Sequence, residues 1–209
     1  STLMRSSAAS DVYKRQGKLA PKGQADLAFV EHMIYHMDED DGRVAVLLPH
    51  GVLFRGGAEE TIRKYIIKDL NRLDAVIGLP ANLFHGTGIP VCVLVLKSKR
   101  NGNAGNILFI DASKEFKAGK NQNVLEQKNI DKIVETYEKR VDVDKFAHVA
   151  KMSEIAENGY NLNIPRYVDT FEEEEPVDLN EVKSHIQKLD AARKVMIEKA
   201  NSMLKELGL

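Results

Sequence analysis

Apolar positions recur first at helical and then at strand spacing along the N-terminal half of the chain. From Lys22 onward, Leu27, Val30, Ile34 and Met37 recur every three or four residues, with Asp and Glu on the other face. This pattern predicts an amphipathic helix that ends near Gly42. Short, continuous apolar runs at residues 43–49 and 73–80 predict strands that are buried on both faces.

The segments between and after these strands complete an expected α/β sheet. RGGAEETIRKYIIKDL predicts a second amphipathic helix, so the order strand, helix, strand favours parallel pairing. The loop ANLFHGTG then leads directly into the strand IPVCVLVLKSK, and two strands joined by a loop alone are expected to be antiparallel. Residues 106–113 predict one more strand, and residues near 130–137 predict a helix packed against the sheet edge through Ile130, Ile133, Val134 and Tyr137.

The C-terminal region has a different pattern. The acidic run at residues 171–177 has the composition of a solvated linker. Residues 178–209 then predict a long helix, with Asp178 as N-cap, Glu181 completing a capping box and Gly208 ending it. Its coiled-coil seam consists of Leu179, Val182, Ile186, Leu189, Arg193, Met196, Ala200, Met203 and Leu207. Such a seam needs a partner helix, or else it folds back onto its own domain.

Composition bounds the remaining possibilities. The chain has 209 residues, 43% of them hydrophobic, a net charge of −1 and one cysteine. It therefore has no intramolecular disulfide framework, and its overall charge would not draw it onto nucleic acid. No apolar run reaches the length of a transmembrane helix, so a cytoplasmic location is the default expectation. We interpret residues 1–16 as a leader unrelated to the fold, and residues 17–170 as one partial domain.

Several side chains with chemical potential have plainer interpretations. His32 and His36 stand one helical turn apart, but no third ligand is placed by sequence, so no metal site is predicted. Cys92 lies in an apolar strand and is expected to be a small buried hydrophobe. The basic cluster Lys97, Lys99 and Arg100 could contact phosphate, although such charges at a strand end are most often solvated.

Four blocks carry a resemblance to a known family. GRVAVLLPHGVLFRGGAEETIRKYII, LDAVIGLPANLFHGTGIPVCVLVLK, ILFIDASKEF and NGYNLNIPRYVD occur in order and at suitable spacing. Together they resemble the modification subunit of type I restriction-modification systems, an adenine-N6 DNA methyltransferase. The resemblance implies the distal half of a Rossmann-like, S-adenosylmethionine-dependent methyltransferase sheet, mostly parallel with an antiparallel hairpin strand, followed by a coiled-coil-like helix.

The resemblance also implies a cofactor and partners. The cofactor is S-adenosylmethionine and the substrate is DNA. The C-terminal helix is expected to dock on the DNA-specificity subunit through Leu179, Val182, Ile186, Leu189, Met196, Met203 and Leu207. The full complex would add the restriction subunit.

Whether this chain is active alone depends on two motifs of the family. The family uses a Phe-x-Gly-x-Gly turn for the cofactor and an Asn-Pro-Pro-Phe loop for the target amino group, and no Asn-Pro-Pro occurs here. The letters of the turn recur in FHGTG, but a cofactor turn should open a helix, and this one leads into a strand. We therefore assign no catalytic, cofactor-binding or metal-binding residue, expect an upstream part to be missing, and predict an inactive chain without measurable S-adenosylmethionine binding.

In the family, the FHGTG loop lies beside the target-base pocket. The resemblance makes Phe84 a candidate for stacking on an extruded adenine, with Gly86, Thr87 and Gly88 close to the backbone or base. Two alternatives remain open. In one, Phe84 plugs the core beneath the loop; in the other, the glycines simply permit a tight hairpin connection.

The segment ENGYNLNIPRYV, residues 157–168, is the family's closing signature. The resemblance implies that its loop borders the DNA groove, with Asn161, Asn163 and Arg166 available for phosphate or base-edge hydrogen bonds. The plainer interpretation is that Tyr160, Leu162, Ile164 and Tyr167 alternate inward and fix the last segment on the core.

A second functional class also fits the sequence. The chain could be a non-catalytic interaction module that uses an α/β scaffold to present the coiled-coil tail. An Asn-Pro-Pro-Phe motif just upstream of Lys18 would favour the enzyme. Because half of the sheet is expected to be missing, we also expect an exposed strand edge and poor solubility.

Overall fold

The computed structural model describes residues 20–21, 23–170 and 179–206. Its elements are α2 (Asp26–His36), β1 (Arg43–Pro49), α3 (Gly51–Phe54), α4 (Ala58–Lys64), the π-helix η1 (Tyr65–Asp69), β2 (Leu73–Gly78), β3 (Val91–Lys97), β4 (Asn106–Asp111), α5 (Gln127–Lys139), β5 (Ala147–Lys151), α6 (Met152–Glu157), the 3-10 turn η2 (Ile164–Arg166) and α7 (Leu179–Glu206). The chain divides into two compact units, residues 1–170 and 171–209. The expected leader and linker, and the cap residues Asp178 and Gly208, lie outside the described residues.

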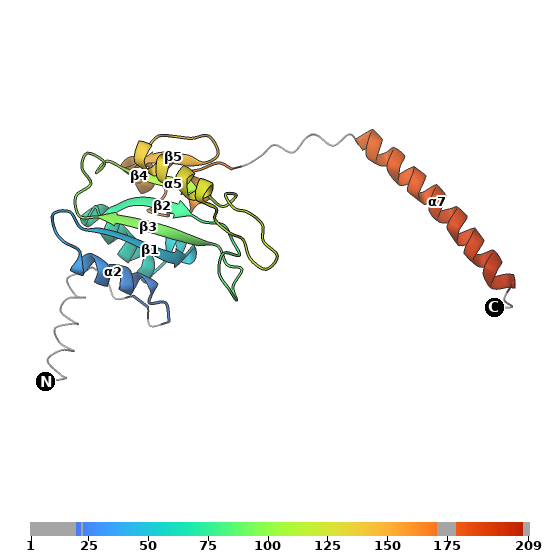
Figure 1. Cartoon of the computed structure of the whole chain (residues 1–209), viewed down its shortest axis with the longest axis horizontal. Helices are drawn as coiled ribbons and strands as arrows, with labels where there is room; N and C mark the ends of the chain where they lie inside the picture. The colour runs from blue at the N-terminus through green and yellow to red at the C-terminus, as the bar shows by residue number, and fades with distance from the viewer. Residues whose placement is uncertain (1–19, 22, 171–178, 207–209) are drawn as a thin grey trace. The chain divides into compact units, whose positions relative to one another are not determined.

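The five described strands form one mixed sheet in the order β1-β3-β2-β4-β5 (Figure 1). Strand β3 is antiparallel to both β1 and β2, β2 is parallel to β4, and β4 is antiparallel to β5. The expected α/β class with an antiparallel strand is confirmed. The described sheet has fewer parallel pairs than expected, because β3 inserts between β1 and β2. Strands β1, β2 and β4 still run in one direction, and we call the edge at which they end the carboxyl edge.

Helices cover the two faces of the sheet unequally. One hydrophobic cluster joins α2, α3, α4, η1 and the signature segment to the sheet, and a smaller cluster joins α5 to β2, β4 and β5. Figure 1 shows α2 alongside β1 and α5 over the sheet near β2. The expected helix near residues 130–137 is confirmed as α5, but only Ile133 of its four predicted apolar residues is buried, whereas Ile130 and Val134 are exposed.

Strand β5 was not predicted from the sequence. Residues 147–151 pair with β4 from Asn106 to Ile110, and Ala147 and Ala150 are buried. A strand of five residues with small apolar side chains gives too weak an alternation to separate it from a loop.

Strand β1 departs from the expectation of burial on both faces. Its burial alternates, so that Val44, Val46 and Leu48 pack toward the cluster containing α2, whereas Ala45 and Leu47 are exposed. In the part of the chain that the structure describes, β1 pairs only with β3. Leu47 is 43% exposed. The strand therefore presents an open edge and an uncovered apolar face.

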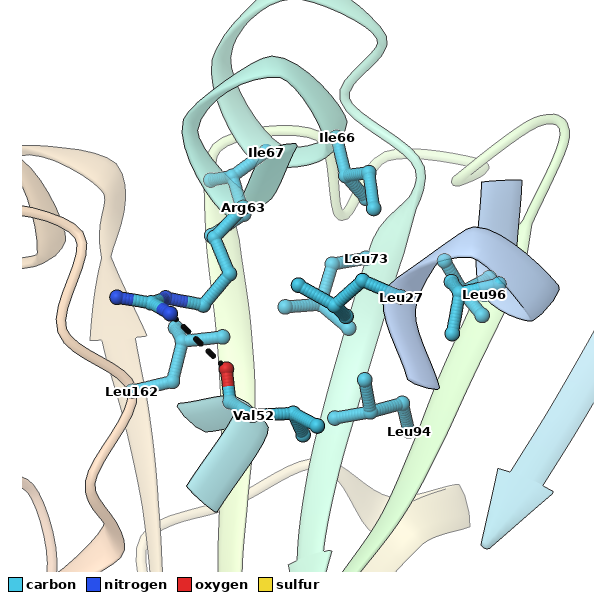
Figure 2. Close-up of a pocket in the computed structure, with 10 residues that line it drawn as sticks. Leu27, Val52, Arg63, Ile66, Ile67, Leu73, Leu94, Leu96 and Leu162 are labelled. Carbon is cyan, nitrogen blue, oxygen red and sulfur yellow. Dashed lines mark hydrogen bonds between the residues drawn. The ribbon is translucent and has the colours of Figure 1, made fainter. Parts of the chain in front are cut away.

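A buried arginine joins the helices beneath the carboxyl edge. Arg63 donates hydrogen bonds to the carbonyls of Val52 at 3.1 Å, Arg55 at 2.6 Å and Tyr160 at 3.4 Å. Figure 2 shows its side chain beside Leu162, at the wall of an apolar cavity of about 10 Å³ between α2, η1 and the sheet. Arg63 thus ties α3, α4 and the signature segment together at the edge of the core.

Candidate functional site

The carboxyl edge brings together the two segments that the sequence singled out. The FHGTG loop follows β2 directly, and the signature segment reaches the same strand end through Ile164. A Cβ atom on Gly78, the last residue of β2, would lie 2.6 Å from Ile164 Cδ1, so the signature segment packs closely against this strand end. Ligands of open α/β sheets bind outside the carboxyl ends of the parallel strands. Both segments therefore lie where a substrate is expected.

The FHGTG loop is a tight exposed turn. Phe84 pairs with Thr87 as an isolated β-bridge, and Gly86 between them has φ = 80°. Phe84 is 42% exposed, so the alternative in which it plugs the core is wrong. The chain continues into β3, a strand, which agrees with our rejection of a helix-opening cofactor turn.

The two glycines of this loop have separate structural reasons. Gly86 has the left-handed backbone conformation that glycine adopts without strain. A Cβ atom on Gly88 would lie 2.7 Å from Asn82 Oδ1, so a larger residue there would have to displace the Asn82 side chain. The hairpin-like geometry is confirmed, and it leaves the ring of Phe84 accessible to solvent.

The signature segment buries its apolar side chains, as the plainer interpretation predicted. Leu162, Ile164 and Tyr167 are buried, and Tyr160 is half-buried. The ring of Tyr167 stacks on Phe109 with centroids 3.9 Å apart, and its hydroxyl donates to the carbonyl of Asn161 at 2.6 Å. Burial raises the pKa of Tyr167 to about 12. This phenol is therefore a structural anchor.

The polar residues of the same segment are more exposed than its apolar residues. Asn161 and Asn163 are half-buried and Arg166 is exposed. Asn161 Oδ1 accepts the backbone N–H of Asn163 at 2.9 Å, which closes a local turn. Arg166 has a long contact of 3.5 Å with Asn158 Oδ1. The inward and outward interpretations of this segment are thus compatible, and contact of its polar face with DNA stays a prediction.

The basic cluster Lys97, Lys99 and Arg100 has other partners. Lys97 Nζ lies 3.0 Å and Arg100 Nε 3.5 Å from the buried carboxylate of Asp74, and Arg140 also pairs with it. Burial alone would raise the pKa of Asp74, but hydrogen bonds from Tyr137 and Lys97 outweigh it and lower that pKa.

These charges lie at the start of β2 and the end of β3, opposite the carboxyl edge. Lys99 pairs with Asp40 at the surface, and the side chain of Arg100 is buried. The phosphate-contact hypothesis for this cluster is therefore not supported.

Cys92 is a small buried hydrophobe, as the sequence predicted. Burial raises the pKa of the Cys92 thiol to about 12, and its Sγ lies 3.5 Å from the carbonyl of Leu48. The rings of His32 and His36 contact edge to face. Among the described residues, no three His, Cys, Asp or Glu side chains form a metal-binding group, and no described helix has the length and apolarity to span a membrane.

Sequence reasoning missed two residues at the carboxyl edge. His50 follows β1 directly, and its Nε2 lies 3.0 Å from the carbonyl of Val91, at the start of β3. A histidine immediately after a buried strand was the available signal. Asn123 donates from its side chain to the carbonyl of Ala81 at 2.9 Å, at the base of the FHGTG loop. Nothing in the local sequence around Asn123 indicates this contact.

A family model described as "N-6 DNA Methylase" matches residues 4–176. The chain belongs to the N-6 DNA methylase family. The type I restriction enzyme MpnII methylase subunit of Mycoplasma pneumoniae is 38% identical over 97% of this chain and 37% of its own length. The MjaVII methylase subunit of Methanocaldococcus jannaschii is 39% identical over 88% of this chain and 32% of its own length. This N-6 DNA methylase chain thus spans about a third of each relative's length.

A solved structure supports the same assignment. The type I restriction-modification methyltransferase subunit from Streptococcus thermophilus is 55% identical, with a TM-score of 0.72, over 76% of this chain and 33% of that one. A second type I structure, 18% identical with a TM-score of 0.55, shares the fold. The methylase chain therefore has the fold of the type I subunits.

Two glycine turns of the described residues differ from the turn that an S-adenosylmethionine site needs. Such a site needs a glycine turn that opens a helix and leaves room for a ligand. Gly51 opens α3 after β1, but a Cβ atom there would lie 2.4 Å from the guanidinium of Arg55, which fills the space. The FHGTG turn opens a strand.

Proposed function

We propose that the chain forms the target-base side of an adenine-N6 DNA methyltransferase of a type I restriction-modification system. The observation that carries this proposal is the exposed ring of Phe84 on a glycine turn at the carboxyl edge. An enzyme that modifies a base inside a duplex must extrude that base, and an exposed aromatic ring stabilises it by stacking. The exposure of Phe84 and its position after β2 support that role.

The neighbouring residues have supporting roles in this proposal. Thr87, Gly86 and Gly88 let the backbone approach the base closely, and Asn161, Asn163 and Arg166 supply hydrogen bonds to phosphate or base edges. S-adenosylmethionine would bind in a part of the longer methylase outside this chain, as would the group that holds the adenine amino nitrogen. The chain alone would then be inactive.

We further propose that α7 docks on the DNA-specificity subunit, with residues 171–177 as the linker. Within the described side chains, Val182, Ile186, Leu189, Met196 and Met203 are exposed along α7 and form the predicted stripe. The side chain of Leu179 and the whole of Leu207 lie outside the described residues. A seam of this kind is stable when it packs against another helix. The restriction subunit would join the same complex, in the cytoplasm.

A chimeric methylase tests the enzymatic proposal. This chain, from Gly17 onward, replaces the matching third of the Streptococcus thermophilus subunit, and the product is assembled with its specificity subunit. We expect N6-methyladenine in target DNA by mass spectrometry. Phe84→Ala should lower kcat by roughly tenfold to a hundredfold, since misplacing a reacting group costs that much. Phe84→Trp keeps an aromatic ring and should retain most of the activity.

The same experiment separates the two functional classes. An interaction module predicts that the chimera assembles while Phe84→Ala leaves methylation unchanged. Gel filtration of each variant shows whether assembly is intact. If Phe84→Ala and Phe84→Trp have equal activity in assembled complexes, Phe84 has no stacking role and the proposal is wrong.

A further inference from the structure

The geometry points to Asn123 as the residue that positions Phe84 for stacking on the target base, an inference that rests on the proposed function. Asn123 lies far from the FHGTG loop in sequence, between β4 and α5. It belongs to a short hairpin, residues 117–124, which Lys117 and Val124 close with two backbone hydrogen bonds of 2.9 and 3.0 Å. We call this segment the support hairpin.

The support hairpin is itself fixed to α5. Lys117 Nζ lies 2.8 Å from a carboxylate oxygen of Glu126, the N-cap residue of α5. Glu126 and Asn129 form a reciprocal capping box there, and the N–H of Glu126 donates to Asn129 Oδ1 at 3.0 Å. Because α5 packs on the sheet through Ile133, the hairpin is anchored to the folded core.

Asn123 donates hydrogen bonds to two consecutive carbonyls at the base of the FHGTG loop. Its side-chain Nδ2 donates to the carbonyl of Ala81 at 2.9 Å, and its backbone N–H donates to the carbonyl of Asn82 at 2.8 Å. Asn123 is half-buried, so these bonds are partly shielded from water. The side-chain bond is the one that a substitution can remove.

Through Asn82, the hydrogen bonds from Asn123 restrict both ends of the FHGTG turn. Asn82 has φ = 56°, a conformation that asparagine tolerates better than most residues. Its Oδ1 lies against Gly88, 2.7 Å from where a Cβ atom would stand. Phe84 lies between Asn82 and Gly88 and pairs with Thr87. The direction of the Phe84 ring therefore depends on how Asn82 is held.

The hydrophobic core does not hold this turn. All residues from Phe84 to Pro90 are exposed, so burial contributes little to their order. An exposed turn without side-chain support samples many conformations, and restricting it on binding costs entropy. Hydrogen bonds from Asn123 restrict the turn before DNA arrives. Asn123 is thus a positioning residue, which acts through the loop that carries Phe84.

A single fluorophore reports on the turn in the 209-residue chain itself. The chain has no tryptophan, so Phe84→Trp introduces the only one. Asn123→Ala removes the side-chain donor, and Asn123→Asp keeps the shape but places an acceptor against the Ala81 carbonyl. Asn123→Gln keeps a donor and is the conservative rescue. Asn121→Ala, an exposed asparagine of the same hairpin, is the matched control.

We expect lower fluorescence anisotropy of the introduced tryptophan in Asn123→Ala and Asn123→Asp, partial recovery in Asn123→Gln, and no change in Asn121→Ala. Melting followed by circular dichroism should not distinguish these variants, which would show that the fold is intact. In the chimeric complex, Asn123→Asp should lower kcat by roughly tenfold with little change in KM for DNA.

The outcomes separate this inference from the proposed function. If Phe84→Ala reduces methylation while the Asn123 variants change neither anisotropy nor kcat, Asn123 has no positioning role and the proposed function stands. If the Asn123 variants loosen the turn while neither they nor Phe84→Ala alter methylation, the hydrogen bonds of Asn123 do restrict the loop. The inference that this restriction positions Phe84 for a target base is then overturned together with the proposed function.

Discussion

Glu31 lies on the face of α2 that packs toward the sheet, where it is 2% exposed. The expectation that the acidic residues of this helix face solvent is wrong at this position. Neither of its carboxylate oxygens has a hydrogen-bond partner. Burial raises the pKa of Glu31 from about 4.5 to about 7. A buried, unpaired carboxylate is costly when ionised, so near neutral pH the folded chain holds this proton more tightly than the unfolded chain does.

We predict that Glu31 makes stability fall as pH rises from about 4.5 to about 7. In this window the unfolded chain releases the proton and the folded chain retains it, so the free energy of unfolding decreases. Above the window, the stability lost through Glu31 stays constant. A shift of this size corresponds to roughly 3 kcal/mol. Urea unfolding at a series of pH values should show that Glu31→Gln removes this slope. Glu39→Gln, on an exposed loop, should leave it in place, and equal slopes for both variants would contradict the prediction.

At the scale of elements, segments far apart in sequence are joined by hydrogen bonds to backbone carbonyls. Arg63 of α4 bonds to carbonyls of α3 and of the signature segment, and the N–H of Leu162 donates to the carbonyl of Leu53 at 2.9 Å. Helix α4 continues into the π-helix η1, whose wider turn lets the consecutive residues Ile66 and Ile67 both point into the core. The helical period alone did not predict the hydrogen bonds of Arg63 and Leu162.

We predict that Arg63→Met destabilises the chain by roughly 2–4 kcal/mol, because it leaves buried carbonyls without donors. Lys64→Met removes an exposed ion pair with Glu60 and a cation–π contact with the ring of Tyr160, and should cost less than about 1 kcal/mol. The free energy of unfolding in urea measures both. Equal losses in the two variants would show that the buried hydrogen bonds of Arg63 add nothing.

At the scale of the whole molecule, the sheet of the described chain is open at β1. This strand pairs on one side only, and its exposed residues Ala45 and Leu47 are apolar. The relatives that match this chain are about three times as long. An unpaired, apolar edge strand is a template for association with other chains. Poor solubility of the isolated chain therefore remains our expectation.

We predict that Leu47→Lys reduces self-association, because a charge on the exposed face of an edge strand opposes pairing. Leu48 is the adjacent residue on the buried face, so Leu48→Lys should instead unfold the chain. Sedimentation velocity over a range of concentrations measures the first effect, and circular dichroism the second. If Leu47→Lys associates as strongly as the unmodified chain, β1 is not the surface responsible.

The sequence by itself determined the periodic elements. It indicated α2, α4 and α5, four of the five described strands, the burial of Cys92, and a FHGTG loop that leads into a strand. These features follow from local spacing, because helix and strand periods place apolar side chains on predictable faces. The candidate Phe84 came from the resemblance to a family, and its exposure came from the structure.

Only the tertiary structure decided how these elements meet. It placed β3 between β1 and β2, paired β5 with β4, buried Glu31, gave Arg100 a partner in Asp74, and brought Asn123 to the base of the FHGTG loop. Each of these depends on contacts between residues distant in sequence. Strand order and buried polar pairing depend on which chain segments pack together and exclude water. The local spacing of apolar residues does not indicate which segments these are.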